Sequence, residues 1–277
     1  MHAVVIFGIA LVLPLALGGR LWWWALSATA AAGAFAVPRG PGAAVLVVPF
    51  ALTVVAVLVR WVAGAGPWRA WGLAEGGAGL ARVYAVVAAA ALAQSRAGLM
   101  PFGIREPLVE LTAVHYTFAG AAAVVLAERA LRHGPGPRAL GRAAVVLTAA
   151  APPVVAAGFV TRAAVPQVGG AALMTLGVWA TATLELRRAF AERRYPAGAG
   201  QTVLPVAAGR SVLPVAASRS VLLVVSGLAV WAPMVLALAW AAGQHWAVPA
   251  LPVAAMVRTH GAANALGFVL CGLVATR

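Results

Sequence analysis

The chain has 277 residues, of which 63% are hydrophobic and only 9% are charged. So little charge cannot cover the surface of a water-soluble globule of this length, which excludes a soluble protein. The twenty basic residues, all arginine, outnumber the six acidic ones, all glutamate, but they lie mainly in short loops between apolar runs, which is typical of loops beside anionic lipid and not of a nucleic-acid-binding groove.

Nine apolar runs follow one another along the chain, each bounded by glycine, proline or arginine. A helix needs about 20 apolar residues to cross a bilayer, and it satisfies its own backbone hydrogen bonds where water is absent. We therefore predict an all-α, polytopic transmembrane bundle that forms a single integral membrane domain over residues 1–277. The predicted spans are residues 3–17, 21–37, 43–63, 80–93, 108–126, 139–160, 168–186, 221–241 and 252–276.

The first run could instead be a cleaved signal peptide, which would leave eight spans. It lacks a positively charged start, and it is followed at once by Gly18, Gly19, Arg20 and the second run. These features favour a retained first helix and a total of nine spans.

The arginines also predict an orientation. With nine spans the loops alternate between two sides, and fifteen arginines fall on the side of the C-terminus. Because arginine is enriched in cytoplasmic loops, we expect the C-terminus inside and the N-terminus outside. Four arginines fall on the outer side, namely Arg39, Arg96, Arg105 and Arg162.

A short tandem duplication separates the seventh and eighth runs. The motif Val-Leu-Pro-Val-Ala-Ala occurs twice within residues 202–220. Two short copies cannot form a solenoid, and their proline and arginine content is typical of a linker. We expect residues 188–219 to form a cytoplasmic linker.

Polar side chains inside apolar runs indicate where function lies, because each is costly unless it faces a partner or a wet cavity. In the fifth run, Glu106 and Glu110 are one turn apart and share a face with Thr117, whereas His115 points to roughly the opposite face. Glu106 could equally be an interfacial group, and Glu110 could simply pair with a nearby arginine.

The ninth run carries His260 and Asn264 four residues apart, and therefore on one face, whereas Arg258 points away from them. At about 1.5 Å per residue, His115 and His260 both lie roughly 12 Å below the outer boundary, so they could meet. Asn264 would then orient His260. A hydrogen bond that only fixes helix packing is the alternative.

These two segments resemble the YndJ-like family of bacterial membrane proteins. The similarity rests on Glu106-Pro107, Leu-Thr-Ala-Val-His115 and Ala119-Gly120 in the fifth run, and on His260-Gly261, Asn264-Ala265 and Gly267-Phe268 in the ninth. It implies a multi-helix fold in a bacterial plasma membrane, and the family is commonly labelled as transporters. The family pattern has a second histidine two positions after the first, where this chain has Thr117.

We expect no metal and no cofactor. Neither histidine-bearing run has the His-x-x-x-His spacing that would place two imidazoles on one face, and the single cysteine, Cys271, cannot form a disulfide or a thiolate cluster within one chain. The absence of aspartate also disfavours ionisation of a diphosphate by bound magnesium.

The first functional hypothesis is a membrane enzyme that acts on a hydrophobic, isoprenoid or lipid-like substrate, in the manner of a membrane terpene cyclase that protonates and cyclises its substrate. Glu110 would be the acid, and His115 and His260 would be acid, base or ligand, with Asn264 in support. The substrate-binding candidates are Glu106, Tyr116, Thr117, Trp179, Trp231, Trp240 and Arg258.

A second hypothesis is a transporter or proton-coupled carrier that uses the same residues, with Pro49, Pro152, Pro153 and Pro233 as possible kinks. A third is a structural or sensory protein without turnover, in which loss of the histidines would reduce stability alone. Beyond the lipid bilayer and a hydrophobic small molecule, the sequence indicates no partner, and it leaves the oligomeric state open.

Overall fold

The computed structural model describes residues 1–194 and 213–277, and within these ranges the chain is helical without any strand. The all-α prediction is therefore confirmed. The first four apolar runs form α1 (His2–Phe7), η1 (Gly8–Val12) and α2 (Leu13–Leu17), then α3 (Leu21–Ala36), then α4 (Pro41–Val45) and α5 (Val48–Gly64), then α6 (Leu73–Ala97). Short 3-10 turns, η2 (Trp68–Ala70) and η3 (Pro101–Gly103), stand before and after α6.

The second part of the chain continues in the same way. The fifth to ninth runs form α7 (Leu108–His115), η4 (Tyr116–Ala122) and α8 (Ala123–His133), then α9 (Arg138–Thr161), then α10 (Ala164–Arg194), then α11 (Leu213–Ala229) and α12 (Trp231–Gly243), then α13 (Val253–Met256), η5 (Val257–Gly261), η6 (Ala263–Leu270) and α14 (Cys271–Ala275).

Six helices in the described ranges are long and apolar enough to cross a membrane. The other helical runs differ from them in length or polarity: the first helix is short, α3 has 16 residues, and α10 is 31 residues long but ends in charged residues. These apolar helices fit a lipid bilayer. The six are Pro41–Gly64, Leu73–Ala97, Leu108–His133, Arg138–Thr161, Ser218–Gly243 and Val253–Ala275.

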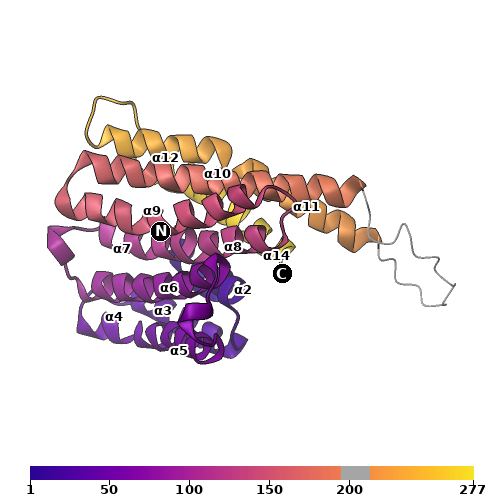
Figure 1. Ribbon diagram of the computed structural model, residues 1–277. Coiled ribbons are helices and arrows are strands. Elements are labelled where there is room, and N and C mark those ends of the chain that lie inside the picture. Colours follow the sequence, from indigo (N-terminus) through magenta and orange to yellow (C-terminus); the bar gives the residue numbers. More distant parts are fainter. Residues whose placement is uncertain (195–212) are drawn as a thin grey trace.

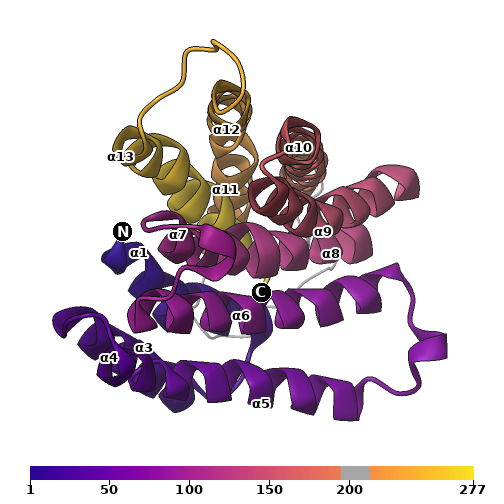
Figure 2. The same cartoon turned by 90° about the vertical axis from the view of Figure 1, so that its left-hand side faces the viewer.

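The segment from α7 to α8 lies at the centre of the bundle. In its apolar stretch 67% of residues are buried, against 28% in four of the other five candidate spans. Helices α3, α4 and α5 cover one side, helices α10 to α13 cover the opposite side, and α6 to α9 lie between them (Figure 2). The central segment therefore contacts both halves of the molecule.

Glycines allow α9 and α10 to pack closely. A Cβ atom at Gly170 would lie 2.6 Å from the backbone nitrogen of Val155, and one at Gly177 would lie 2.6 Å from that of Thr148. Both distances are too short for any other residue, so the two backbones touch through these glycines. Such contacts stabilise helix pairs in membranes, where burial of apolar surface adds little.

Three of the apolar runs contain π-helical turns, in which the backbone widens locally. They are η1 in the first run, η4 in the fifth, and η5 and η6 in the ninth. The first two face each other, because Gly8 packs against Thr117 and Phe118. Since π-turns in helices are frequent at functional sites, they indicate that the fifth and ninth runs contribute to such a site.

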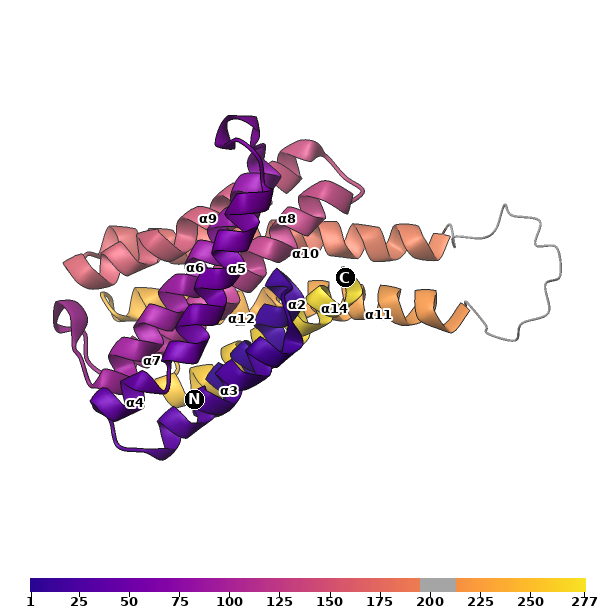
Figure 3. The ribbon, with the colours of Figure 1, turned by 90° about the horizontal axis from the view of Figure 1, so that it is seen from below.

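Several helices extend beyond the predicted runs. Helix α6 begins at Leu73 because the Glu75 carboxylate accepts a hydrogen bond from the Gly72 amide at 3.0 Å and caps the first turn. Helices α10 and α11 project beyond the rest of the bundle (Figure 3). The predicted linker therefore has helical ends at residues 188–194 and 213–219. Its centre lies outside the described residues, and the linker there stays a prediction.

Arg129 joins the ends of two distant helices. Its Nη2 donates to the carbonyls of Leu15 and Ala16 at 3.0 and 3.3 Å, in the last turn of α2. Its Nη1 donates to the carbonyl of Leu273 at 3.4 Å and to the Thr276 hydroxyl at 3.2 Å, at the end of α14. One guanidinium thus satisfies carbonyls that lack partners at two helix C-termini.

We predict that Arg129→Gln lowers the free energy of unfolding by about 2 kcal/mol, because hydrogen bonds to a charged group are lost at both helix ends. Arg129→Lys should recover only part of this, since one ammonium cannot span both ends as the planar guanidinium does. Thermal unfolding in detergent tests this, with Arg138→Gln at an exposed position as the control. An Arg129→Gln protein as stable as the control would contradict the assignment.

Candidate functional site

A cavity of about 480 Å³ lies among α7, η4, α9, α10, α12 and the ninth run. Figure 2 shows α7 below α12 and α13, with α9 and α10 beside them. Its wall is largely apolar, with aromatic rings from Phe118, Phe159, Trp240 and Phe268. A site of this size and character fits a small hydrophobic molecule. The polar side chains in the wall are Gln94, Thr112, His115, Tyr116, Gln167, His260 and Asn264.

His115 lines this cavity from the end of α7. Its Nδ1 lies 2.8 Å from the carbonyl oxygen of Leu111, one turn earlier. A carbonyl can only accept, so Nδ1 carries the proton of this hydrogen bond, and the neutral ring presents an unprotonated Nε2. The backbone of its own helix therefore fixes the tautomer of His115.

His260 lines the same cavity from η5. Its Nδ1 donates to the carbonyl oxygen of Pro233 on α12 at 2.8 Å, so Nε2 is the unprotonated nitrogen of the neutral ring here as well, and the Asn264 amide nitrogen lies 3.5 Å from it. The Asn264 amide donates to the His260 carbonyl at 2.9 Å, and its nitrogen lies 3.2 Å from the imidazole Nδ1. Asn264 thus lies against the histidine that it was expected to orient.

A glutamine contributes a further polar group to the cavity. His245, in the loop after α12, donates from Nε2 to Gln167 Oε1 at 2.9 Å. Gln167 is buried and lines the cavity, and its Nε2 has no hydrogen-bond partner within the described residues. This amide nitrogen is therefore an unpaired, buried donor at the edge of the cavity.

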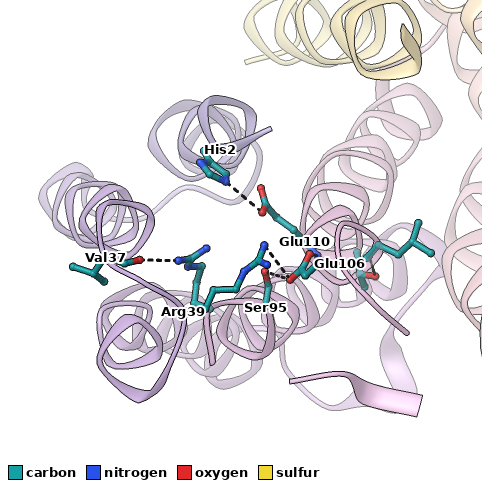
Figure 4. A network of polar contacts seen from close by, with 9 residues as sticks. His2, Val37, Arg39, Ser95, Glu106 and Glu110 are labelled. Atoms are coloured by element: carbon teal, nitrogen blue, oxygen red, sulfur yellow. Dashed lines mark hydrogen bonds and ion pairs between the residues drawn. The ribbon is translucent and has the colours of Figure 1, made fainter. Parts of the chain in front are cut away.

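Glu110 lies in a different place. It is 2% exposed, and its Oε2 lies 3.6 Å from His2 Nε2 on α1, while its Oε1 has no partner among the described residues. Its amide donates to Glu106 Oε2 at 3.2 Å. Figure 4 shows this network on the side of α7 toward α1 and α6. Glu110 is not among the residues that line the cavity, so the structure separates it from the two histidines.

Glu106 belongs to the same network. It accepts a hydrogen bond from the Ser95 hydroxyl at 2.5 Å, and its Oε1 lies 3.7 Å from Arg39 Nη2 (Figure 4). Arg96 is 4% exposed and donates to the Val37 carbonyl at 3.1 Å. These groups, with His2 and Glu110, tie α1, the loop after α3, α6 and α7 together at one end of the bundle.

The remaining candidates divide between the cavity and other positions. Tyr116 and Trp240 line the cavity, and Tyr116 also packs edge-on against Tyr84, with ring centroids 5.3 Å apart. Trp179 and Trp231 stack on each other at 5.1 Å and are not among the lining residues. Thr117 is buried against Gly8, and Arg258 is exposed on the outside of the ninth run.

Metal binding has no geometric support in the described ranges, where no group of three or more histidine, cysteine or acidic side chains is close enough to hold an ion. The two imidazoles alone would leave most of a coordination shell to other ligands.

Glu185 is a buried polar residue that the sequence pattern does not single out. This side chain is 3% exposed in α10, and its Oε2 lies 2.6 Å from the Ser226 hydroxyl oxygen of α11. Its position just before Arg187 and Arg188 resembles that of an interfacial group at a helix end. In the structure α10 continues past these arginines, so the residue before them is buried between helices.

We predict that a large side chain added at the cavity wall leaves the protein stable, whereas the same side chain added in the packed core destabilises it. Ala237→Phe adds a ring to the cavity wall and should keep or raise the thermal stability of delipidated protein. Ala121→Phe adds the same ring at a fully buried position outside the wall and should cost about 1–3 kcal/mol. Equal destabilisation by both changes, measured by thermal unfolding, would show that the space near Ala237 is packed.

In a comparison with protein-family models, the chain matches a family described as YndJ-like protein over residues 3–218 and 200–268. No curated protein matches the chain, and no solved structure does. The matched ranges cover most of the sequence, including both histidine-bearing segments. The chain belongs to the YndJ-like family.

Proposed function

We propose that the protein is an integral membrane enzyme that binds a hydrophobic, isoprenoid or lipid-like substrate in the cavity and moves protons with His115 and His260. One observation carries the proposal: both imidazoles face one apolar cavity, and each has its Nδ1 committed to a main-chain carbonyl. A neutral ring held in this way has an unprotonated Nε2 that can accept a proton, and a protonated ring has an Nε2–H that can donate one.

The chemistry that fits this pair is an isomerisation. The Nε2 of one imidazole accepts a proton from a substrate carbon or hydroxyl, while the other ring, in its protonated form, returns a proton elsewhere on the substrate. The proton count of the substrate is unchanged, and the two rings exchange protonation states. Tyr116, Trp240 and Gln167 would position the substrate, and the aromatic faces would stabilise positive charge that develops on it.

For Glu110 we propose a different role from the expected one. A cyclisation that starts with protonation of an alkene needs a strong acid beside the substrate, and the Glu110 carboxyl faces His2 and Glu106 instead. We assign Glu110 and Glu106 to positioning α1 and α7, and we assign the proton transfer to the histidines.

Product formation tests this assignment. We expect a bacterial host supplied with prenyl and lipid precursors to accumulate an isomeric product with the wild-type protein. His115→Ala and His260→Ala should each lower its amount about a hundredfold or more, because a general acid or base contributes at least that factor. Mass spectrometry of lipid extracts measures the product.

Two variants make the result specific. His133→Ala, at an exposed position at the end of α8, should leave product formation unchanged, as should Glu110→Gln. If Glu110→Gln abolishes the product while the cavity histidines are dispensable, the carboxyl-initiated mechanism is right and the proposed one is wrong.

A carrier is the second candidate, because several helices around the cavity are interrupted. The fifth and ninth runs contain η4, η5 and η6, and α9 contains Pro152 and Pro153. Interrupted helices at a binding site are common in transporters that alternate their access. A fluorescent prenyl phosphate in proteoliposomes distinguishes the two: a carrier moves it across the bilayer unchanged, whereas an enzyme changes it chemically.

We further propose that all nine helical runs cross a bacterial plasma membrane, with the N-terminus outside. The loops after α6, α9 and α12 lie at one end of the bundle, and the C-terminus and the loop after α8 lie at the other (Figure 1). This alternation supports nine spans. The end that holds the C-terminus also holds most of the arginines, as expected for the cytoplasmic side.

Cysteine labelling tests the orientation in a Cys271→Ser background, which removes the natural thiol. Val248→Cys, in the loop after α12, should react with an impermeant maleimide in intact cells. Pro135→Cys, in the loop after α8, should react only after lysis. The reverse pattern would place the N-terminus inside, and labelling of both in intact cells would refute the alternation.

A further inference from the structure

Glu185 is a buried carboxyl group that the proposed reaction does not use. It lies where α10, α11 and the end of the ninth run meet. Its neighbours on the other two helices are Ser226 of α11 and Gly272 of α14, and a Cβ atom at Gly272 would lie 3.0 Å from Glu185 Oε1. The missing side chain at position 272 leaves room for the carboxyl group.

The hydroxyl group of Ser226 lies between two oxygen atoms. It is 2.6 Å from Glu185 Oε2 and 2.8 Å from the carbonyl oxygen of Phe268. A hydroxyl group has one hydrogen, so it can donate to only one of them. The Phe268 carbonyl can only accept, and therefore both short contacts are hydrogen bonds only if the carboxyl group donates to Ser226.

The charges around Glu185 do not favour an ionised carboxylate. Its own helix contributes Arg188, whose Nε is held by Glu192 at 2.9 Å, and the ninth run contributes the Cys271 thiol. Helix α11 contributes the uncharged Ser226, and on α8 Arg129 is engaged by the helix ends described above. Glu185 Oε1 has no hydrogen-bond partner within the described residues, and a lone buried anionic oxygen is costly.

We propose that Glu185 is a proton-binding site, which holds its proton at Oε2 and donates it to Ser226, while Ser226 donates to the Phe268 carbonyl. Phe268 and Val269 line the cavity, so the bound proton lies behind the cavity wall. This assignment rests on the hydrogen-bond geometry alone. It does not depend on whether the cavity belongs to an enzyme or to a carrier.

Infrared spectroscopy tests the proposal directly. In wild-type minus Glu185→Gln difference spectra at neutral pH, in an alkyl maltoside, we expect the carbonyl band of a protonated carboxylic acid, shifted to lower frequency in D₂O. The glutamine amide can replace the acid as a donor to Ser226, so this variant should keep its fold. A difference spectrum that contains only the bands of an ionised carboxylate overturns the proposal.

Two further variants keep the test decisive. Glu192→Gln, at an ion pair with Arg188, should remove only ionised carboxylate bands. Ser226→Ala retains Glu185 but removes its acceptor, so the acid band should move to higher frequency. If Glu185→Gln does not fold, this shift alone decides: an acid band at the wild-type position in Ser226→Ala shows that the proton is not donated to Ser226.

Discussion

The shape of this protein follows from the absence of water in the bilayer core, where every polar group must find its partner within the chain. Helices pair the backbone N–H and C=O groups with each other, and many polar side chains find their partners where helices meet. Ser27 and Thr53 pair at 2.9 Å between α3 and α5, and Arg129 satisfies two helix ends. Among the described residues, the buried side-chain atoms without a hydrogen-bond partner include Gln167 Nε2 at the cavity and Glu185 Oε1 at the proposed proton site.

The central segment from α7 to α8 separates two environments. Glu110 and His115 are five residues apart, which on a helix places them on roughly opposite faces. One face meets His2 and the network of Glu106 and Arg96, and the other meets the apolar cavity. A single helix thus keeps the charged groups on one face away from the cavity on the other face. The widened turn η4 follows directly after this helix. This division is why we assign chemistry to the imidazoles and positioning to the carboxylates.

The sequence predicts the helices well, because apolar runs of membrane length have almost no alternative structure, and it predicts the opposite faces of Glu110 and His115 from helical periodicity. It does not predict tertiary partners. The pairing of Trp179 with Trp231, and of Glu110 with His2, depends on which helices become neighbours, which a single sequence does not encode locally. Glu185 was missed for a related reason, since two following arginines suggested a helix end that the structure places further along.

The central claim is that the cavity bounded by His115 and His260 holds a hydrophobic molecule. Determining the structure of the protein in lipid nanodiscs would test it most directly. The account predicts elongated density in the cavity, with a polar end near the Nε2 atoms of both histidines. A collapsed cavity, or one that contains only water, would contradict it.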